Sequence, residues 1–278
     1  MQWDGTRDEA FDLNRAMWDE RVPAHWASKM YSRHADDLRA CRHCLSEELI
    51  DRMGDVQGRS LVHLQCHMGM ETLSWSRLGA KAVGVDFSGP AIERATHLRD
   101  ELGLDTRFIH GNVYDVTPEL GVGVFDAAFV SVGSLCWLPD VPRWASVVSA
   151  LLKPGGKLLM NEVHPVCDML GQPEGKNHLE PMYPYFPEEG RVFEGDGTYA
   201  DTDMKFKTTK SVEWSHPLGE VVSALIDAGM VIDYLRESTD CNWPAYPLME
   251  QAGEDNWVLP GAMRGKVPMM YTLVAHKK

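Results

Sequence analysis

Polar and ionisable side chains follow two short apolar runs in the first third of the chain. Residues 61–69 have the sequence LVHLQCHMG, in which an apolar run is followed by glutamine, cysteine and histidine and then by Gly69. The next apolar run, AVGVD at residues 82–86, ends in Asp86. A carboxylate there can accept hydrogen bonds from both hydroxyl groups of a ribose, or it can be a favourable charge before the next helix. The spacing therefore raises the question of whether the first segment is a cofactor loop.

Most glycines of a dinucleotide-binding loop are missing from this segment. A G-x-G-x-x-G loop lets the backbone close round two phosphates, and only Gly69 is present here. Side chains at the other positions hold the backbone away from a pyrophosphate, whereas a ligand without phosphate tolerates them. The segment therefore favours a ligand that has no pyrophosphate.

The two histidines of the segment each allow two interpretations. His63 could belong to the site, but it alternates with apolar residues, so it could equally be a hydrogen-bonded histidine of the core. His67 is placed either to cap the following helix or to bind the carboxylate of a cofactor. A metal held by His63, Cys66 and His67 is not expected, because neighbouring side chains of a strand point to opposite faces.

The elements that would position these residues alternate between strands and helices. Strands are expected at 60–64, 82–86, 106–113, 125–131, 157–162, 231–237 and 269–276, and helices at 70–79, 88–103, 142–153 and 218–229. Residues 8–55 are expected to be helical. Such alternation predicts an α/β fold with right-handed crossovers and a mostly parallel sheet with helices on both faces.

One segment interrupts this alternation. Residues 165–213 hold many Pro, Gly, Tyr and Phe residues and end in the polar, β-leaning sequence KFKTTKSVEW. We interpret the segment as an insertion with a small hairpin. The alternating pattern resumes at LGEVVSALIDAGM, residues 218–230.

The composition limits the classes of partner. The chain of 278 residues has a net charge of −14, which opposes binding to nucleic acid because that binding depends on cations that neutralise phosphates. The first residues mix charge into every turn, and no apolar run is long enough to span a membrane. We expect a cytoplasmic protein with neither a nucleic-acid nor a membrane partner. The six scattered cysteines are interpreted as reduced thiols, without a structural metal.

Five motifs resemble one enzyme family. LVHLQCHMG, VGVDFS, HGNVYD, FDAAFVSVGSLCWLPD and LLKPGGKLL occur in the order and spacing of class I S-adenosylmethionine-dependent methyltransferases, the Rossmann-like group that methylates small molecules. The resemblance runs from about residue 45 to 163 and from 214 to 276, and is greatest to a bacterial subgroup with an HLQCH-type first loop. It implies an antiparallel last strand, which PMMYTLVAH would supply.

The resemblance also implies a division of the chain. Residues 56–164 and 214–278 would form the S-adenosylmethionine-binding methyltransferase domain. Residues 1–55 would be an N-terminal helical cap, and residues 165–213 a lid over the substrate.

Cofactor contacts follow from the resemblance position by position. Asp86 would hold the ribose hydroxyls, with Phe87 beside the adenine, while Asn112 and the Val113 backbone would contact the adenine edge. The methionine part would be lined by Gln65, Cys66, His67, Gly69 and Ser131. Gln65 and His67 stand where relatives carry glycine, and His63 stands where an acidic residue is common.

Two histidines are candidate general bases for a hydroxyl or amine acceptor. His164 follows the fifth strand, and His216 precedes a helix at the far end of the insertion. Each could instead order its loop by hydrogen bonding. Glu162 is a third candidate, or a charge at a strand end.

Aromatic residues are the candidates for the acceptor wall, namely Tyr31, Trp137, Tyr185 and Tyr199. They suit a small, aromatic or apolar acceptor, although each could simply pack the insertion against the sheet. The predicted function is methyl transfer from S-adenosylmethionine to an oxygen or nitrogen of a small organic acceptor, with S-adenosylhomocysteine as product and no metal. The alternatives are a nicotinamide-dependent oxidoreductase and a methyltransferase-like binding protein without turnover.

Overall fold

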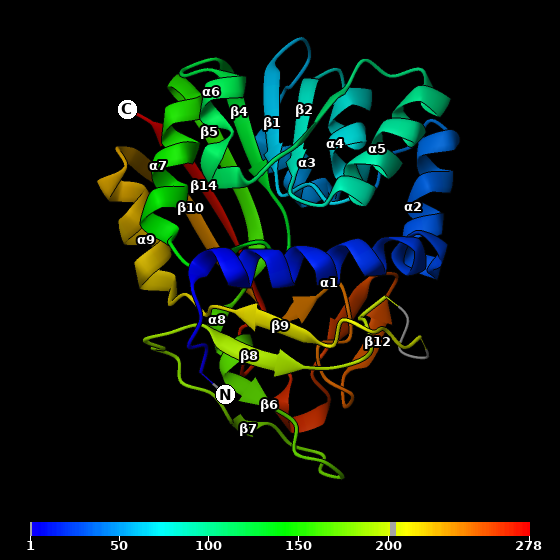
Figure 1. Cartoon of the computed structure of the whole chain (residues 1–278), viewed down its shortest axis with the longest axis vertical. Coiled ribbons are helices and arrows are strands. Elements are labelled where there is room, and N and C mark those ends of the chain that lie inside the picture. The colour runs from blue at the N-terminus through cyan, green and yellow to red at the C-terminus, as the bar shows by residue number, and fades with distance from the viewer. Residues whose placement is uncertain (1, 201–203) are drawn as a thin grey trace.

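A seven-stranded sheet forms the upper half of the protein in Figure 1. The computed structural model describes residues 2–200 and 204–278. The strands are, in their spatial order, β10 (Met230–Ser238), β14 (Met270–Lys277), β5 (Leu152–Val163), β4 (Phe125–Val130), β1 (Ser60–Leu64), β2 (Lys81–Asp86) and β3 (Arg107–His110). The five strands from β5 to β3 pair in parallel, and β14 pairs antiparallel with both β5 and β10. The predicted fold class and the antiparallel last strand are confirmed.

Helices cover both faces of this sheet, as the alternation predicted. They are α4 (Met70–Arg77), α5 (Gly89–Leu102), α6 (Thr117–Leu120), α7 (Val141–Leu151) and α9 (Leu218–Asp227), together with a 3₁₀ turn η1 (Val113–Asp115). Val62 and Leu64 of β1 join the core under α7 and α9, whereas Leu61 joins the core with Trp75 of α4. Alternate residues of one strand therefore feed the two opposite cores.

Local signals set the ends of several elements. Ser88 accepts a hydrogen bond from the Ala91 backbone and starts α5, and Gly103 ends the helix with a left-handed φ of 62°. The third strand is shorter than expected because the Asn112 side chain accepts a bond from Tyr114 N and starts η1. These positions could be found in the sequence from capping chemistry alone.

The N-terminal region is helical, as predicted. It contains α1 (Arg7–Ala27), α2 (Lys29–Arg39) and α3 (Glu47–Met53). In Figure 1, α1 crosses the molecule between the sheet and the lower half. No helix of the described ranges is long and apolar enough to cross a membrane.

The lower half in Figure 1 consists of short elements from two stretches of chain. The insertion supplies α8 (Pro165–Met169), β6 (Leu170–Gly171), β7 (Glu180–Pro181), β8 (Arg191–Glu194) and β9 (Lys210–Glu213). A later stretch supplies β11 (Asp240–Cys241), β12 (Glu250–Gly253), β13 (Asn256–Val258) and the turn η3 (Gly261–Met263). The predicted hairpin is β8–β9. The small sheet β11–β13–β12 was not predicted, because its strands are two to four residues long and have little alternation.

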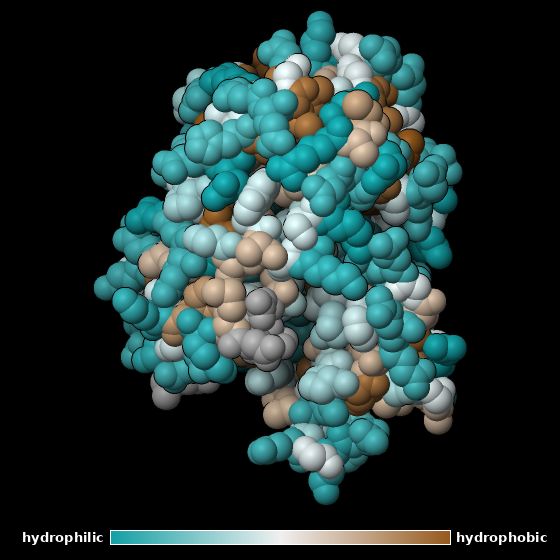
Figure 2. All heavy atoms as spheres, turned by 90° about the vertical axis from the view of Figure 1, so that its right-hand side faces the viewer, coloured by the Kyte–Doolittle hydropathy of each residue, from teal (hydrophilic) through white to brown (hydrophobic). Residues whose placement is uncertain are grey.

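The exposed surface of the protein is mostly polar and carries more acidic than basic side chains. Figure 2 shows one face of the molecule with mostly hydrophilic side chains and apolar residues in small groups between them. Carboxylates exceed cations by 41 to 27 in the sequence, so the exposed surface is predominantly acidic.

One buried amide joins α1 to the insertion. Asn14 is fully buried; its Nδ2 donates to Val212 O at 2.7 Å, and its Oδ1 accepts from Val212 N at 2.8 Å. The side chain thereby satisfies both backbone groups of one residue of β9. Buried backbone groups without partners are costly, so this contact fixes the hairpin beneath α1.

Replacing Asn14 tests this attachment. Asn14→Ala leaves both backbone groups of Val212 without their partner, and we expect the free energy of unfolding in urea to fall by about 2–4 kcal/mol. The matched control is Arg15→Ala on the exposed face of the same helix, where loss of the Asp12 pair is expected to cost under about 1 kcal/mol. Equal effects of the two substitutions would show that the amide contact does not hold the hairpin.

Candidate functional site

A cavity of about 1010 Å³ opens at the carboxyl edge of β1, β2, β4 and β5. Its walls come from this edge, from α1 and α2, and from the lower half of the molecule. All nine residues expected to contact the cofactor line it, namely Gln65, Cys66, His67, Gly69, Asp86, Phe87, Asn112, Val113 and Ser131. The fold therefore brings these residues together, from loops after four different strands.

The loop after β1 keeps a glycine-like backbone although it carries side chains. Gln65, His67 and Gly69 all have a positive φ, of 58°, 48° and 72°. Left-handed backbone costs a residue with a side chain about 1–2 kcal/mol, so two of these positions are strained. At Gly69 a Cβ atom would come within 2.6 Å of the Phe108 ring, so packing as well as backbone geometry requires glycine. The loop thus has the left-handed backbone that glycines usually supply, although two of its three positions carry side chains.

Asp86 closes this loop from the neighbouring strand. Its Oδ2 accepts from His67 N at 2.7 Å and its Oδ1 accepts from Ser88 N at 2.9 Å. Burial raises the pKa of Asp86 to about 6, against the opposing effect of these two backbone donors. The group is largely ionised at neutral pH, and each oxygen keeps a lone pair for a further donor.

Gln65 has an acceptor atom without a partner. Its Nε2 donates to Ser134 O at 2.7 Å, but its Oε1 is buried and has no hydrogen-bond partner within the described part of the chain. A buried carbonyl oxygen without a donor is unfavourable. The position therefore fits a ligand that brings a hydrogen-bond donor, such as an amino group.

A buried carboxylate shapes the loop after β4. Glu162 accepts from the backbone N–H groups of Gly133, Ser134, Leu135 and Val163 at 2.5, 2.9, 3.3 and 2.9 Å. This loop includes Ser134, the partner of Gln65, and leads into the turn η2 (Leu135–Trp137). Because its oxygens already accept four donors, Glu162 has a structural role here.

His63 is a histidine of the core. Its Nδ1 lies 2.8 Å from Thr72 Oγ1 and its Nε2 lies 3.0 Å from Ser131 Oγ. Only 1% of the residue is exposed. Burial lowers its pKa to about 3, so the ring is neutral and both nitrogens are used. Of its two interpretations, the structural one is confirmed.

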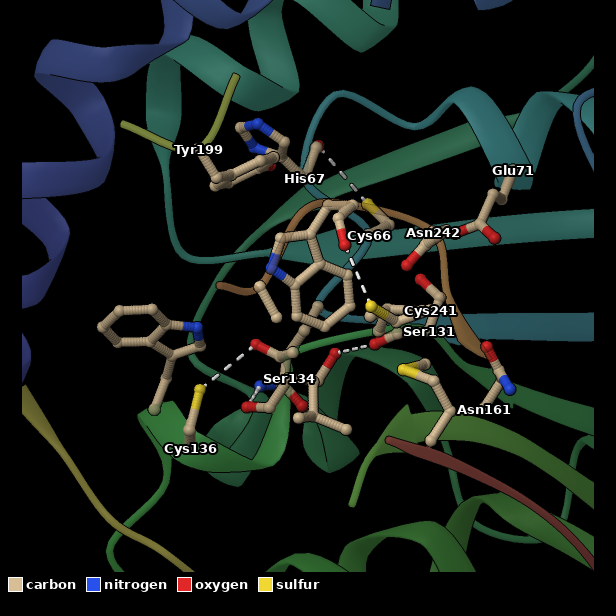
Figure 3. Close-up of a pocket in the computed structure, with 18 of the residues that line it drawn as sticks. Cys66, His67, Glu71, Ser131, Ser134, Cys136, Asn161, Tyr199, Cys241 and Asn242 are labelled. Carbon is tan, nitrogen blue, oxygen red and sulfur yellow. Dashed lines mark hydrogen bonds between the residues drawn. The ribbon is translucent and has the colours of Figure 1, made fainter. Parts of the chain in front are cut away.

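Six aromatic rings gather where the first loop meets the helices and the insertion. This aromatic cluster consists of Trp18, His25, Tyr31, His67, Trp137 and Tyr199, with neighbouring centroids 4.8–6.5 Å apart. It includes three of the four residues expected to contact the acceptor. Figure 3 shows His67 and Tyr199 on one side of the pocket, with Ser131 and Asn161 across from them.

Hydrogen bonds run through this cluster. His67 Nε2 lies 3.1 Å from His25 Nδ1, and His25 Nε2 lies 2.5 Å from Thr198 Oγ1. The hydroxyl groups of Tyr31 and Tyr199 are 2.6 Å apart. The side chain of His67 therefore reaches the N-terminal helices, and the start of α4 after Gly69 has no side-chain cap.

Three expected site residues lie away from the cavity. His164 Nδ1 accepts from Val166 N at 3.1 Å and caps α8, while its Nε2 lies 2.7 Å from Glu237 Oε1. His216 Nε2 lies 2.7 Å from Leu138 O. Tyr185 accepts a bond from Leu218 N at 3.3 Å. None of these three residues is among those that line the cavity, and their contacts order loops and helix starts.

Sequence reasoning missed several charged and polar residues of the cavity wall. These are Glu71, Asn161, Asp168, Arg191 and Glu213. Glu71 and Asn161 each lie two residues beyond a motif of the family resemblance, LVHLQCHMG and LLKPGGKLL, so their positions could have drawn attention. The other three lie in the insertion, whose fold cannot be read from its pattern.

Known proteins share the architecture described above. Residues 62–160 match the family model described as a methyltransferase domain. A curated relative, the ubiquinone biosynthesis O-methyltransferase of Nitrosococcus oceani, is 32% identical over 120 residues, or 42% of this chain. The chain matches about half (49%) of the length of that relative.

Solved structures agree with this match. An S-adenosylmethionine-dependent methyltransferase from Mesorhizobium loti superimposes with a TM-score of 0.58 at 20% identity, over 83% of this chain and 96% of that chain. Residues 62–160 thus match a methyltransferase domain, and the chain shares the fold of class I methyltransferases. A second methyltransferase structure, the 1,6-didemethyltoxoflavin N1-methyltransferase of Burkholderia thailandensis, superimposes with a TM-score of 0.57 at 14% identity, over 100% of this chain and 94% of that chain. The predicted resemblance to this family is confirmed over residues 62–160, and the HLQCH-type subgroup stays a prediction.

The burial of His67 in the aromatic cluster leads us to predict that the stability of the protein depends on pH. Burial lowers the pKa of His67 from 6.5 to about 3. Below pH 6.5 the unfolded chain therefore binds a proton that the folded chain does not, and the folded state loses about 1.4 kcal/mol per pH unit. His67→Asn removes this titration and keeps a residue that tolerates left-handed backbone.

When the pH falls from 7 to 5, we expect the unfolding free energy of the original chain to fall by roughly 2 kcal/mol more than that of His67→Asn. Urea unfolding at several pH values measures this difference. His97→Asn, at an exposed position of α5, is the control for loss of a histidine outside the cluster. A difference for His67→Asn that does not change with pH would mean that this ring is not held neutral by burial.

Proposed function

We propose that the chain transfers a methyl group from S-adenosylmethionine to an oxygen or nitrogen of a small organic acceptor, giving S-adenosylhomocysteine. The observation that carries the proposal is that Asp86 and the unpaired Gln65 Oε1 line one cavity of a class I methyltransferase domain. A fold alone does not define an activity, so the argument rests on these side chains.

The donors and acceptors of the cavity fit the cofactor. Asp86 would accept the ribose hydroxyls with the lone pairs that its two backbone donors leave, and Gln65 Oε1 would accept from the amino group of the methionine part. Phe87, Asn112 and Val113 would flank the adenine beyond β2 and β3. The methionine part would also touch Cys66, His67, Gly69 and Ser131.

The chemistry requires little beyond positioning. S-adenosylmethionine supplies an electrophilic methyl group on a sulfonium, and the transfer is an in-line displacement. The protein must align the acceptor atom with that methyl group at about 3 Å and keep water away, and such alignment supplies a large part of the rate. The aromatic cluster and the loop held by Glu162 would provide walls that cannot easily shift.

The rest of the cavity leaves room for an acceptor. Ligand pockets commonly measure about 300–1,000 Å³, and this one reaches the upper limit. Its lower part lies against residues 165–213, which we propose to act as a lid on the domain of residues 56–164 and 214–278. Residues 1–55 would then be the cap that supplies Trp18 and Tyr31 to the wall.

The two alternatives, an oxidoreductase and a binding protein without turnover, are less well supported by the residues of the cavity. A nicotinamide-dependent oxidoreductase must bind a pyrophosphate, and the side chains of Gln65 and His67 occupy the loop positions where that ligand needs glycine. A binding protein without turnover would have the same cofactor site. A measurement of methyl transfer to an acceptor would distinguish such a binding protein from the proposed enzyme.

Calorimetric titration with S-adenosylhomocysteine tests the ribose contact. We expect micromolar binding by the original chain and roughly tenfold or weaker binding by Asp86→Ala, because an ionised acceptor is lost. Asp105→Ala, at an exposed loop position, is the control and should bind normally. Thermal unfolding of each variant checks that the fold persists. Absence of binding by the original chain would refute the proposed cofactor.

Gln65→Gly tests the methionine contact separately. Glycine suits the φ of 58° at this position, so the loop should keep its shape while the orphaned acceptor disappears. We expect binding of S-adenosylhomocysteine to weaken about 10-fold or more, whereas binding of adenosine, which has no amino acid part, should change little. Equal weakening of both ligands would show that Gln65 acts on the whole loop and not on the amino group.

A further inference from the structure

Three charged side chains at the insertion end of the cavity have no part in the function described so far. They are Asp168 of α8, Arg191 of β8 and Glu213 of β9, and all three line the same cavity as Gln65 and Asp86. Arg191 and Glu213 are directly opposite each other in the antiparallel hairpin. Asp168 is close enough for both charges to influence its pKa.

These charges are not paired with one another. Within residues 2–200 and 204–278, none of the three forms an ion pair with N···O of 4.0 Å or less, although shorter pairs occur at many exposed sites. Glu213 accepts one bond, from Ser211 Oγ at 3.0 Å. Asp168 accepts none from any described residue. Charges in a cavity wall are costly unless something pairs with them.

Arg191 has a donor without a partner. Its Nη1 is buried and forms no hydrogen bond with any residue that the structure describes. Its guanidinium carbon lies 4.1 Å from the ring centroid of Tyr183 and 5.1 Å from that of Phe193. The two rings hold the guanidinium in place, and Nη1 remains available for an acceptor.

The net charge at this end of the cavity favours a cationic ligand. Two carboxylates face a single guanidinium, so this end of the cavity is negative when all three groups are ionised. Burial, together with the nearby Glu162 and Glu213 charges, raises the pKa of Asp168 to about 7, against the opposing effect of Arg191. Burial also raises the pKa of Glu213. A bound cation would offset the cost of burying both carboxylates and the repulsion that adds to the shift of Asp168.

We propose that the methyl acceptor carries a protonated amine that binds between Asp168 and Glu213, and an oxygen that accepts a hydrogen bond from Arg191. Tyr183, Phe193 and Trp214 line the same end and offer aromatic faces, which also favour a cationic ligand. The acceptor class is therefore an amino acid or amino alcohol with an apolar or aromatic remainder. This inference rests on the proposed methyltransferase function and specifies its acceptor.

The test uses matched ligands on protein saturated with S-adenosylhomocysteine. L-tyrosine has amine and carboxylate, tyramine has only the amine, 3-(4-hydroxyphenyl)propionate has only the carboxylate, and 4-ethylphenol has neither. L-norleucine and hexanoate form an aliphatic pair. Calorimetry should show that each amine binds at least tenfold more tightly than its counterpart without the amine, and methyl transfer from S-adenosylmethionine to the phenol oxygen of the four phenolic ligands should follow the same order.

Isosteric variants assign the effect to residues. Asp168→Asn and Glu213→Gln should each weaken binding of the amines about tenfold or more and leave binding of S-adenosylhomocysteine unchanged. Arg191→Met should abolish the preference for L-tyrosine over tyramine. Glu189→Gln, an exposed carboxylate of the insertion, should behave like the original chain. A merely structural role predicts instead that Asp168→Asn lowers the thermal midpoint, whereas removal of an unpaired buried charge should not lower it.

The outcomes separate the two proposals. Normal binding of S-adenosylhomocysteine, together with equal affinity for amine and non-amine ligands or no binding of any amine at millimolar concentration, would overturn the amine acceptor and leave the methyltransferase standing. Failure to bind S-adenosylhomocysteine would overturn the methyltransferase function itself.

Discussion

The left-handed backbone of the loop after β1 is the constraint on which the rest of the site depends. Because residues 65, 67 and 69 share this conformation, the chain turns sharply out of the sheet and presents His67 N to Asp86. The same turn sends the Gln65 side chain to the β4 loop and the His67 ring to the cap helices. Side chains in place of glycine strain this loop, but they also connect it to two other walls of the cavity.

The sequence predicted those parts of the structure that short-range rules determine. Ser88, Gly103 and the period of the apolar residues located α5 and the strands around it, and the position of Asp86 at a strand end placed it in the cavity. It did not predict in which direction a side chain turns. His164 follows β5 as expected, yet its ring faces the start of α8, because the first backbone N–H groups of a helix attract an acceptor. The structure of the lower half was harder still to predict, because its strands of two to four residues depend on packing against segments that are distant in the sequence.

The buried carboxylates of the molecule fall into two kinds. Glu162 accepts four backbone donors, so its charge is matched entirely by the protein and its loop is fixed. Asp168 lies close enough for the Glu162 charge to raise its pKa, yet Asp168 and Glu213 together receive one hydrogen bond from the described residues, donated by the Ser211 hydroxyl to Glu213. Proteins satisfy the charges that hold structure, and unsatisfied charge in a cavity is typical of a position where a ligand completes the site. The contrast between neighbouring groups is more informative than the burial of any one of them.

The Asn14 contact with Val212 also has a consequence for association between molecules. Because β9 pairs only with β8, the backbone groups that Asn14 binds belong to the outer edge of a two-stranded ribbon. On the opposite edge, Gln2 forms a bridge with Arg191, and Trp3 N donates to Gly190 O. An open strand edge is a template on which another chain can add a strand and aggregate. The N-terminal segment covers both edges of the hairpin and so protects the protein against this kind of self-assembly.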